Sequence, residues 1–129
     1  MTPRILILAD DLIWSSRLAA AAQHAGATVV AARSLAQLEA ALADESALAG
    51  VVVDLGARRY DGVAAVQRAH EAGPSVLAVA QHDDVPLRKR ALAAGADRVL
   101  SYNKMHADGP AVISRWLRRA DQAPKTAVR

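Results

Sequence analysis

Short, continuous apolar stretches alternate along the chain with longer segments in which apolar residues recur every three or four positions. A short run that is apolar throughout is typical of a strand covered on both faces, and the longer period is typical of a helix with one buried face. The pattern therefore predicts five strands that alternate with five helices. The strands are predicted at residues 5–9, 28–32, 51–53, 76–80 and 98–101.

Residues that favour helix ends mark the segments between these strands. Ser34 and Gln37 have the spacing of a capping box, and Pro86 suits the first turn of a helix that begins near Asp84. The last helix is predicted to begin at Asp108, with Pro110 in its first turn. The other helices are predicted to follow Asp11 and to begin at Ser34 and near Gly62. Gly26, Gly73 and Gly95 are predicted to end the first, third and fourth helices.

Composition favours one α/β domain. The chain has 129 residues, 53% of them hydrophobic but only 3% aromatic, so its core must consist mainly of small aliphatic side chains that suit helices packed on a parallel sheet. Right-handed crossovers leave few topologies, and the commonest one places the first strand beside the third. We expect a three-layer α/β/α sandwich with a five-stranded parallel sheet in the order 2-1-3-4-5, a flavodoxin-like fold. The domain is expected to span residues 1–121, followed by a flexible tail at 122–129.

Charge and residue usage exclude several classes of protein. The chain has no Cys, which excludes disulfides, thiol chemistry and cysteine zinc sites. No apolar run is long enough to cross a membrane, and Asp10 and Asp11 interrupt the N-terminal run, so we expect a cytoplasmic protein with no membrane partner. The net charge of +3 comes from a mixed surface, and no helix-turn-helix or RNA-binding motif is visible, so a nucleic-acid partner is not expected.

Acidic residues stand where two of the predicted strands end. Asp10 and Asp11 follow the first strand, and Asp54 follows the third. If these strands are neighbours, the three carboxylates share one pocket at the edge of the sheet where ligands bind in such folds. Oxygen ligands at an open site suit Mg²⁺, and a carboxylate beside the ion can attack phosphorus to form an aspartyl phosphate.

Purely structural roles would also explain these aspartates. Asp10 and Asp11 are equally suited to capping a helix, and a single Asp such as Asp54 is common in turns. A nucleotide-binding domain of this fold would need a Gly-rich or Ser-rich loop where the acidic pair stands. A hydrolase with an aspartate nucleophile would need an acid two residues further on, where Leu12 and Ile13 stand. We therefore expect no catalytic residues and no enzymatic turnover.

At these positions the sequence resembles the CheY-like receiver domain of bacterial two-component response regulators. The resemblance rests on four motifs: Ile-Leu-Ile-Leu-Ala-Asp10-Asp11, Val-Val-Val-Asp54, Asp61-Gly62 and Ala94-Gly95-Ala96-Asp97. It implies that Asp54 is the phosphoacceptor. It also implies that Mg²⁺ is held by Asp10, Asp11, Asp54 and the backbone carbonyl of Gly56.

Other positions depart from the receiver pattern. Ala80 replaces the Ser or Thr that binds the phosphoryl group, and Tyr102 replaces the Lys that pairs with it. Val99 stands at the position of the aromatic switch residue. These three positions are interpreted as degenerate switch positions, which indicates that the usual response machinery is missing.

Three cations are candidates to replace the missing Lys. Lys104 lies two residues beyond the expected position, and Arg58 and Arg59 follow Asp54 in the chain. Any of them would also neutralise the carboxylates directly, as an internal salt bridge in place of Mg²⁺.

The resemblance implies a stand-alone receiver-like domain in phosphorelay signal transduction that contacts a histidine kinase or a downstream signalling protein. It also implies a homodimer through the fourth helix, fifth strand and fifth helix. The departures favour an alternative, a pseudo-receiver that binds a protein partner independently of phosphorylation.

Overall fold

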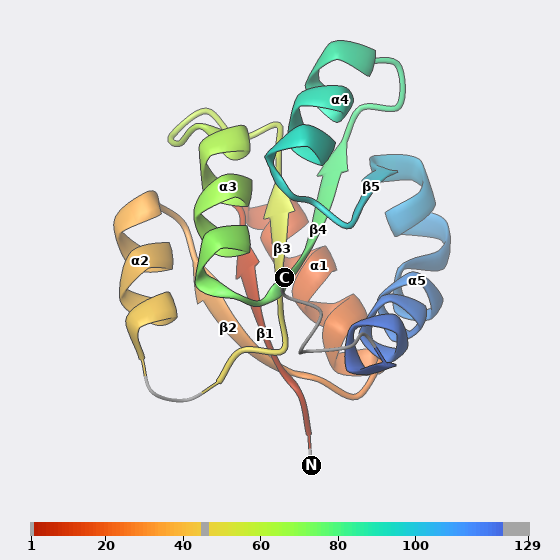
Figure 1. Cartoon of the computed structure of the whole chain (residues 1–129). Helices are drawn as coiled ribbons and strands as arrows, with labels where there is room; N and C mark the ends of the chain where they lie inside the picture. The colour runs from red at the N-terminus through yellow and green to blue at the C-terminus, as the bar shows by residue number, and fades with distance from the viewer. Residues whose placement is uncertain (1, 45–46, 123–129) are drawn as a thin grey trace.

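The computed structural model describes residues 2–44 and 47–122, which form a five-stranded parallel sheet covered by helices on both faces (Figure 1). The strand order is β2-β1-β3-β4-β5, which confirms the predicted topology. The strands are β1 Arg4–Leu8, β2 Thr28–Ala32, β3 Gly50–Asp54, β4 Ser75–Ala80 and β5 Arg98–Ser101. The helices are α1 Leu12–His24, α2 Leu35–Ala43, α3 Gly62–Ala72, α4 Val85–Ala94 and α5 Tyr102–Gln122.

The sheet separates two hydrophobic cores. Successive residues of a strand point to opposite faces. On β1, Leu6 and Leu8 therefore pack beneath α2, α3 and α4, whereas Ile5 and Ile7 pack beneath α1 and α5. Figure 1 shows the same division of the helices into two layers. Trp116 of α5 is buried, and a Cβ atom at position 50 would overlap its indole ring, so Gly50 allows this helix to lie close to the sheet.

Local capping explains where most helices begin. The side chains of Asp11, Ser34, Asp61 and Asp84 accept hydrogen bonds from backbone N–H groups in the first turns of α1, α2, α3 and α4. Gly73 and Gly95 follow α3 and α4 with φ of 118° and 121°, a conformation that side chains with a Cβ rarely adopt. The predicted boundaries of these elements are confirmed to within a residue or two.

The start of the last helix differs from the prediction. A helical segment begins directly after β5 at Tyr102, where the Ser101 hydroxyl accepts a hydrogen bond from the backbone N–H of Lys104 at 3.0 Å. The backbone leaves the helical conformation at Asp108, with φ of −143° and ψ of 26°, and Pro110 lies in the turn that follows. The predicted start at Asp108 is thus only the second part of α5. Position 122 of the predicted tail is the last residue of α5, and positions 123–129 lie outside the described residues.

The carboxyl ends of β1 and β3 lie side by side, because Leu8 is paired with Val53 in parallel register. Asp10 and Asp11 follow β1 at this edge of the sheet, and Asp54 is the last residue of β3. Within the described part of the chain, no helix has the length and hydropathy needed to span a membrane.

Candidate functional site

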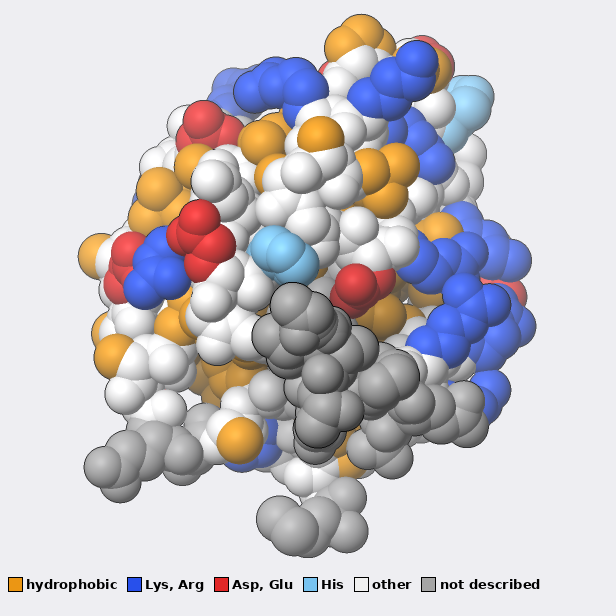
Figure 2. All heavy atoms as spheres, in the orientation of Figure 1, with side chains coloured by type: hydrophobic (Ala, Val, Ile, Leu, Met, Phe, Trp, Pro, Cys, Tyr) orange, Lys and Arg blue, Asp and Glu red, His pale blue; other side chains and the backbone are white. Residues whose placement is uncertain are grey.

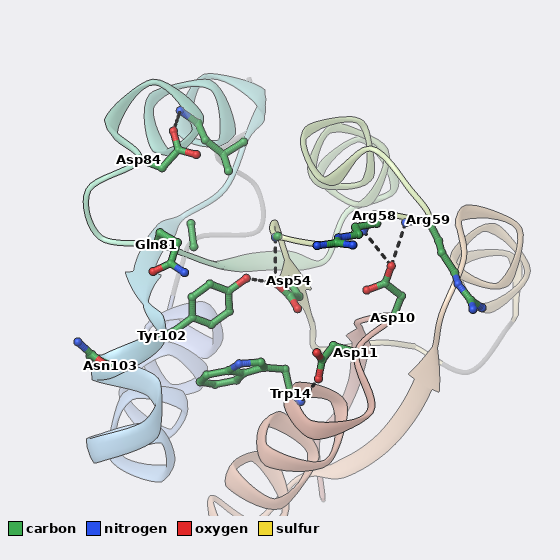
Figure 3. Close-up of a pocket in the computed structure, with 13 residues that line it drawn as sticks. Asp10, Asp11, Trp14, Asp54, Arg58, Arg59, Gln81, Asp84, Tyr102 and Asn103 are labelled. Atoms are coloured by element: carbon green, nitrogen blue, oxygen red, sulfur yellow. Dashed lines mark hydrogen bonds between the residues drawn. The ribbon is translucent and has the colours of Figure 1, made fainter.

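A pocket of about 830 Å³ opens at the carboxyl ends of the strands (Figure 3). Asp10, Asp11 and Asp54 all line it, so the structure brings together the three carboxylates that the sequence places at strand ends. We call this the acidic pocket. Its other lining residues are Trp14, Gly56, Arg58, Arg59, Ala80, Gln81, Asp84, Leu87, Tyr102 and Asn103.

Asp10 is held by the loop that follows β3. Its Oδ2 accepts hydrogen bonds from the backbone N–H groups of Arg58 and Arg59, both at 2.9 Å. Two consecutive N–H groups directed at one carboxylate oxygen form a small anion-binding nest. The negative charge of Asp10 is therefore stabilised by the backbone of a segment about fifty residues away in the sequence.

Asp11 has the capping role that its sequence position allowed. Its Oδ1 accepts a hydrogen bond from the backbone N–H of Trp14 at 3.0 Å, and its backbone is extended, as is usual for the residue before a helix. Its carboxylate thus stabilises the N-terminus of α1.

Asp54 is almost completely buried, with 3% of its surface exposed. Its Oδ1 accepts hydrogen bonds from the Gly56 N–H at 2.9 Å and from the Tyr102 hydroxyl. Burial raises the pKa of Asp54 above its ordinary value of 3.8, the two hydrogen bonds act against this shift, and the charges of Asp10 and Asp11 add to it. Within the described part of the chain, its Oδ2 receives no hydrogen bond.

Tyr102 is positioned by an aromatic neighbour. Its ring lies 4.7 Å from that of Trp14, centroid to centroid, and the guanidinium of Arg17 lies 5.2 Å from the Trp14 ring on α1. Figure 3 shows Tyr102 pointing at Asp54, with Trp14 alongside its ring. Burial and the neighbouring Asp54 raise the pKa of Tyr102 above 10.0, so its hydroxyl remains a hydrogen-bond donor at neutral pH.

A second tyrosine holds the two strand ends together. The Tyr60 hydroxyl lies 2.8 Å from the carbonyl oxygen of Asp54 and 3.0 Å from that of Leu8, and Tyr60 is itself buried. Burial raises its pKa, so the hydroxyl stays protonated and shares its one proton between two carbonyl groups. No sequence motif points to Tyr60. The one available signal is that a buried Tyr needs a partner for its hydroxyl.

The candidate cations lie in different places. The ammonium of Lys104 is 3.2 Å from Asp108, which also lies 3.8 Å from Arg115, and Lys104 is absent from the lining of the acidic pocket. Arg58 and Arg59 do line the pocket, but among the described residues neither forms an ion pair with its aspartates. Their contribution to Asp10 comes from backbone N–H groups instead.

The degenerate switch positions also have defined places. Ala80 lines the acidic pocket and offers no hydroxyl. Val99 is buried in the core next to α4, and its carbonyl oxygen accepts a hydrogen bond from Nη2 of Arg88 at 3.1 Å. Tyr102 forms a hydrogen bond to Asp54.

The carboxylates as arranged do not form a ready-made site for a divalent cation. In residues 2–44 and 47–122, no three side chains of His, Cys, Asp or Glu are grouped as a metal site requires. Each carboxylate of the predicted site already accepts a hydrogen bond from the protein. Mg²⁺ needs closely convergent oxygens in near-octahedral geometry, whereas one oxygen of each of these carboxylates is already held by a separate donor.

Comparison with known proteins gives a match at the level of structure. No protein-family model matches the sequence, and no curated protein matches it. A receiver domain protein (CheY-like) from Methanospirillum hungatei superimposes with a TM-score of 0.81 at 19% identity, over 95% of this chain and 98% of that one. NtrX from Brucella abortus superimposes with a TM-score of 0.82 at 19% identity, over 94% of this chain but only 28% of NtrX.

A third neighbour is a response regulator from Burkholderia pseudomallei with a phosphorylated aspartic acid, a calcium ion and citrate. It has a TM-score of 0.73 at 17% identity, over 92% of this chain and 71% of that one. Sequence identities this low establish the architecture alone. The chain has the CheY-like fold of response-regulator receiver domains.

Proposed function

We propose that this chain is a receiver-like signalling domain that acts by binding another protein and that is not controlled by phosphorylation of Asp54. The observation that carries the proposal is the hydrogen bond from the Tyr102 hydroxyl to Oδ1 of Asp54. In this reading the fold is retained as an interaction module, and the domain has no catalytic turnover of its own.

The chemistry of the acidic pocket supports this proposal. A carboxylate that attacks phosphorus must be ionised and accessible, and positive charge must stabilise the transferred phosphoryl group. Burial favours the neutral form of Asp54, and Tyr102 and Gly56 occupy one of its oxygens. Ala80 offers no hydroxyl, and the ammonium of Lys104 pairs with Asp108 instead of reaching the pocket.

The surface offers places for a protein partner. Leu12 and Ile13, at the start of α1, are 68% and 62% exposed, and Val85 and Leu92 of α4 are each 49% exposed. Large apolar side chains at the surface are common in protein interfaces when they lie together. Figure 2 shows Lys and Arg side chains gathered over α5, with others near α4. Exposed basic residues of these helices are Lys89, Arg90, Lys104, Arg115, Arg118 and Arg119.

The positive charge over α4 and α5 affects which partner this surface can bind. A face-to-face homodimer through α4, β5 and α5 would bring two positively charged surfaces together, and like charges oppose such contact. We therefore favour a different protein as the partner over the homodimer that the resemblance implies.

Treatment with acetyl phosphate and Mg²⁺, followed by intact-mass measurement, tests the proposal. We expect no stoichiometric phosphoryl adduct, because the nucleophile is hydrogen-bonded and its burial disfavours the charged form. A receiver domain with intact Ser or Thr and Lys positions, treated in parallel, serves as the positive control. An adduct on this chain that disappears in Asp54→Asn would contradict the proposal.

One observation favours a second candidate function, that of a receiver domain controlled by phosphorylation of Asp54. Oδ2 of Asp54 receives no hydrogen bond from the described residues, and the acidic pocket is open. The neighbour from Burkholderia pseudomallei carries a phosphorylated aspartate and a calcium ion on the same fold. The intact-mass experiment separates the two candidates, since only the second predicts an adduct at Asp54.

A further inference from the structure

We propose that hydrogen-bond donors of the chain itself replace a divalent cation in the acidic pocket, and that the Tyr102 hydroxyl, held over Gly56, is the donor that keeps Mg²⁺ out. The inference deepens the proposed function, on which it rests. It concerns cation binding in the absence of any phosphoryl donor.

Five donors serve the three carboxylates. The N–H groups of Arg58 and Arg59 bind Asp10, the N–H of Trp14 binds Asp11, and Asp54 accepts from the Gly56 N–H and the Tyr102 hydroxyl. Asp54 is buried and Asp10 is partly buried, so repulsion between these neighbouring carboxylates is poorly screened and needs such compensation. Hydrogen bonds to an ionised acceptor are among the stronger hydrogen bonds, and they compensate the negative charge without a metal.

Only one of these donors is a side chain. The four backbone N–H groups are fixed by the first turn of α1 and by the loop after β3, so no substitution other than proline removes one of them. The Tyr102 hydroxyl, in contrast, depends on one residue. It is also the only donor that spans from α5 to β3, across 48 residues of sequence.

Gly56 makes room for this hydroxyl. A Cβ atom built at position 56 would overlap the oxygen of Tyr102, whereas Oδ1 of Asp54 would be 3.5 Å away, an ordinary contact. Gly56 is not among the glycines with positive φ in the described chain, so its backbone does not itself require glycine. The missing side chain therefore matters here chiefly because Tyr102 takes its place.

The Tyr102 ring packs against an aromatic neighbour. It lies against Trp14, and the guanidinium of Arg17 lies over the Trp14 ring. To bind a cation with Oδ1, Asp54 would have to give up its bond to Tyr102, and the ring would have to move away from the pocket. Removal of the hydroxyl leaves Oδ1 bonded to the Gly56 N–H alone, without removing the ring from its place beside Trp14.

Calorimetric titration with MgCl₂ alone, without a phosphoryl donor, tests the inference. The proteins are the wild type, Tyr102→Phe, which removes the hydroxyl, and Gly56→Ala, which displaces it. We expect Mg²⁺ to bind both variants at least about tenfold more tightly than the wild type, the effect of about one hydrogen bond. Trp14 lines the pocket, so its fluorescence provides a second readout of binding.

Tyr60→Phe is the matched control. It also removes a buried tyrosine hydroxyl, but that hydroxyl contacts backbone carbonyl groups and not the Asp54 carboxylate. We expect no gain of Mg²⁺ binding in this variant. Adding Asp54→Asn to Tyr102→Phe should abolish the gain, which places the new site at Asp54. Far-ultraviolet circular dichroism shows whether each variant is folded.

Two results would overturn the inference. One is a wild-type protein that binds Mg²⁺ as tightly as Tyr102→Phe, and the other is a pair of folded variants that bind it no better than Tyr60→Phe. Neither result depends on phosphorylation. A phosphoryl adduct on Asp54 would contradict the proposed function, whereas the cation titration is read on unphosphorylated protein, so the two failures are distinguishable.

Discussion

Replacing Asp54 with Asn is expected to stabilise the protein by about 1 kcal/mol at neutral pH, the size of one net hydrogen-bond or desolvation effect. Most substitutions of buried residues destabilise, so the sign is informative. Asp54 is 3% exposed, and burial raises its pKa, which means that the folded state binds a proton more tightly than the unfolded state. Asn keeps an oxygen for the Gly56 and Tyr102 donors and removes the buried charge.

The pH dependence of this effect follows from the raised pKa. Below the ordinary value of 3.8, Asp54 is protonated in both states and imposes no charge penalty. As the pH rises through the raised pKa of the folded protein, the wild type loses stability, and Asp54→Asn does not. The difference in free energy of unfolding between the two proteins should therefore be small in acid and widen toward neutral pH.

Urea unfolding of both proteins at several pH values measures this difference. Asp83→Asn is the matched control, because Asp83 is exposed and has no part in the acidic pocket lining. The control should unfold like the wild type at every pH. A destabilised Asp54→Asn at neutral pH, or a gap that narrows as the pH rises, would show that the Asp54 charge is well accommodated by its neighbours.

Replacing Tyr60 with Phe is expected to destabilise the protein by about 2 kcal/mol. The hydroxyl serves the carbonyl groups of Leu8 and Asp54, and a buried acceptor left without a donor costs on the order of 1–3 kcal/mol. Phe fills nearly the same volume, so the loss reports the hydrogen bonds and not a cavity. The midpoint of urea unfolding should fall, with an unchanged slope.

Tyr102→Phe provides the comparison for this prediction. Its hydroxyl binds a carboxylate that faces an open pocket, so water can replace the lost donor, and we expect a smaller destabilisation than for Tyr60→Phe. Equal losses in the two variants would indicate that the two strand-end carbonyl groups also find water, and that Tyr60 does not hold β1 and β3 together.

The strands and most helices could be read from local pattern. Apolar runs such as Ile5–Leu8 can only be buried between two layers, and capping residues such as Ser34 act within a few positions of themselves. The start of α5 could not be read in the same way. The prediction relied on Asp108 and Pro110 as signals for the start of the helix. In the structure, the Ser101 hydroxyl caps a helical segment that begins before Asp108, and a single Ser in the sequence does not predict such a start.

The acidic pocket was likewise predictable from the sequence only in part. Strand ends and parallel order suffice to place Asp10, Asp11 and Asp54 around one pocket, because carboxyl ends of parallel strands share one edge. Lys104 was a candidate cation on sequence distance alone, but α5 turns its ammonium toward Asp108. The direction of a long side chain depends on helix phase and on which partner lies nearest.

The sequence by itself determined the layered α/β architecture, the strand order and the meeting of three aspartates, since these follow from short-range periodicity and a small set of permitted topologies. Only the tertiary structure decided what each carboxylate binds: a backbone nest for Asp10, a helix N-terminus for Asp11 and the Tyr102 hydroxyl for Asp54. The physical reason is the short range of hydrogen bonds. Hydrogen bonds act over about 3 Å and depend on direction, so partners 48 residues apart are chosen by the packing of α1, α5 and the sheet and not by local sequence.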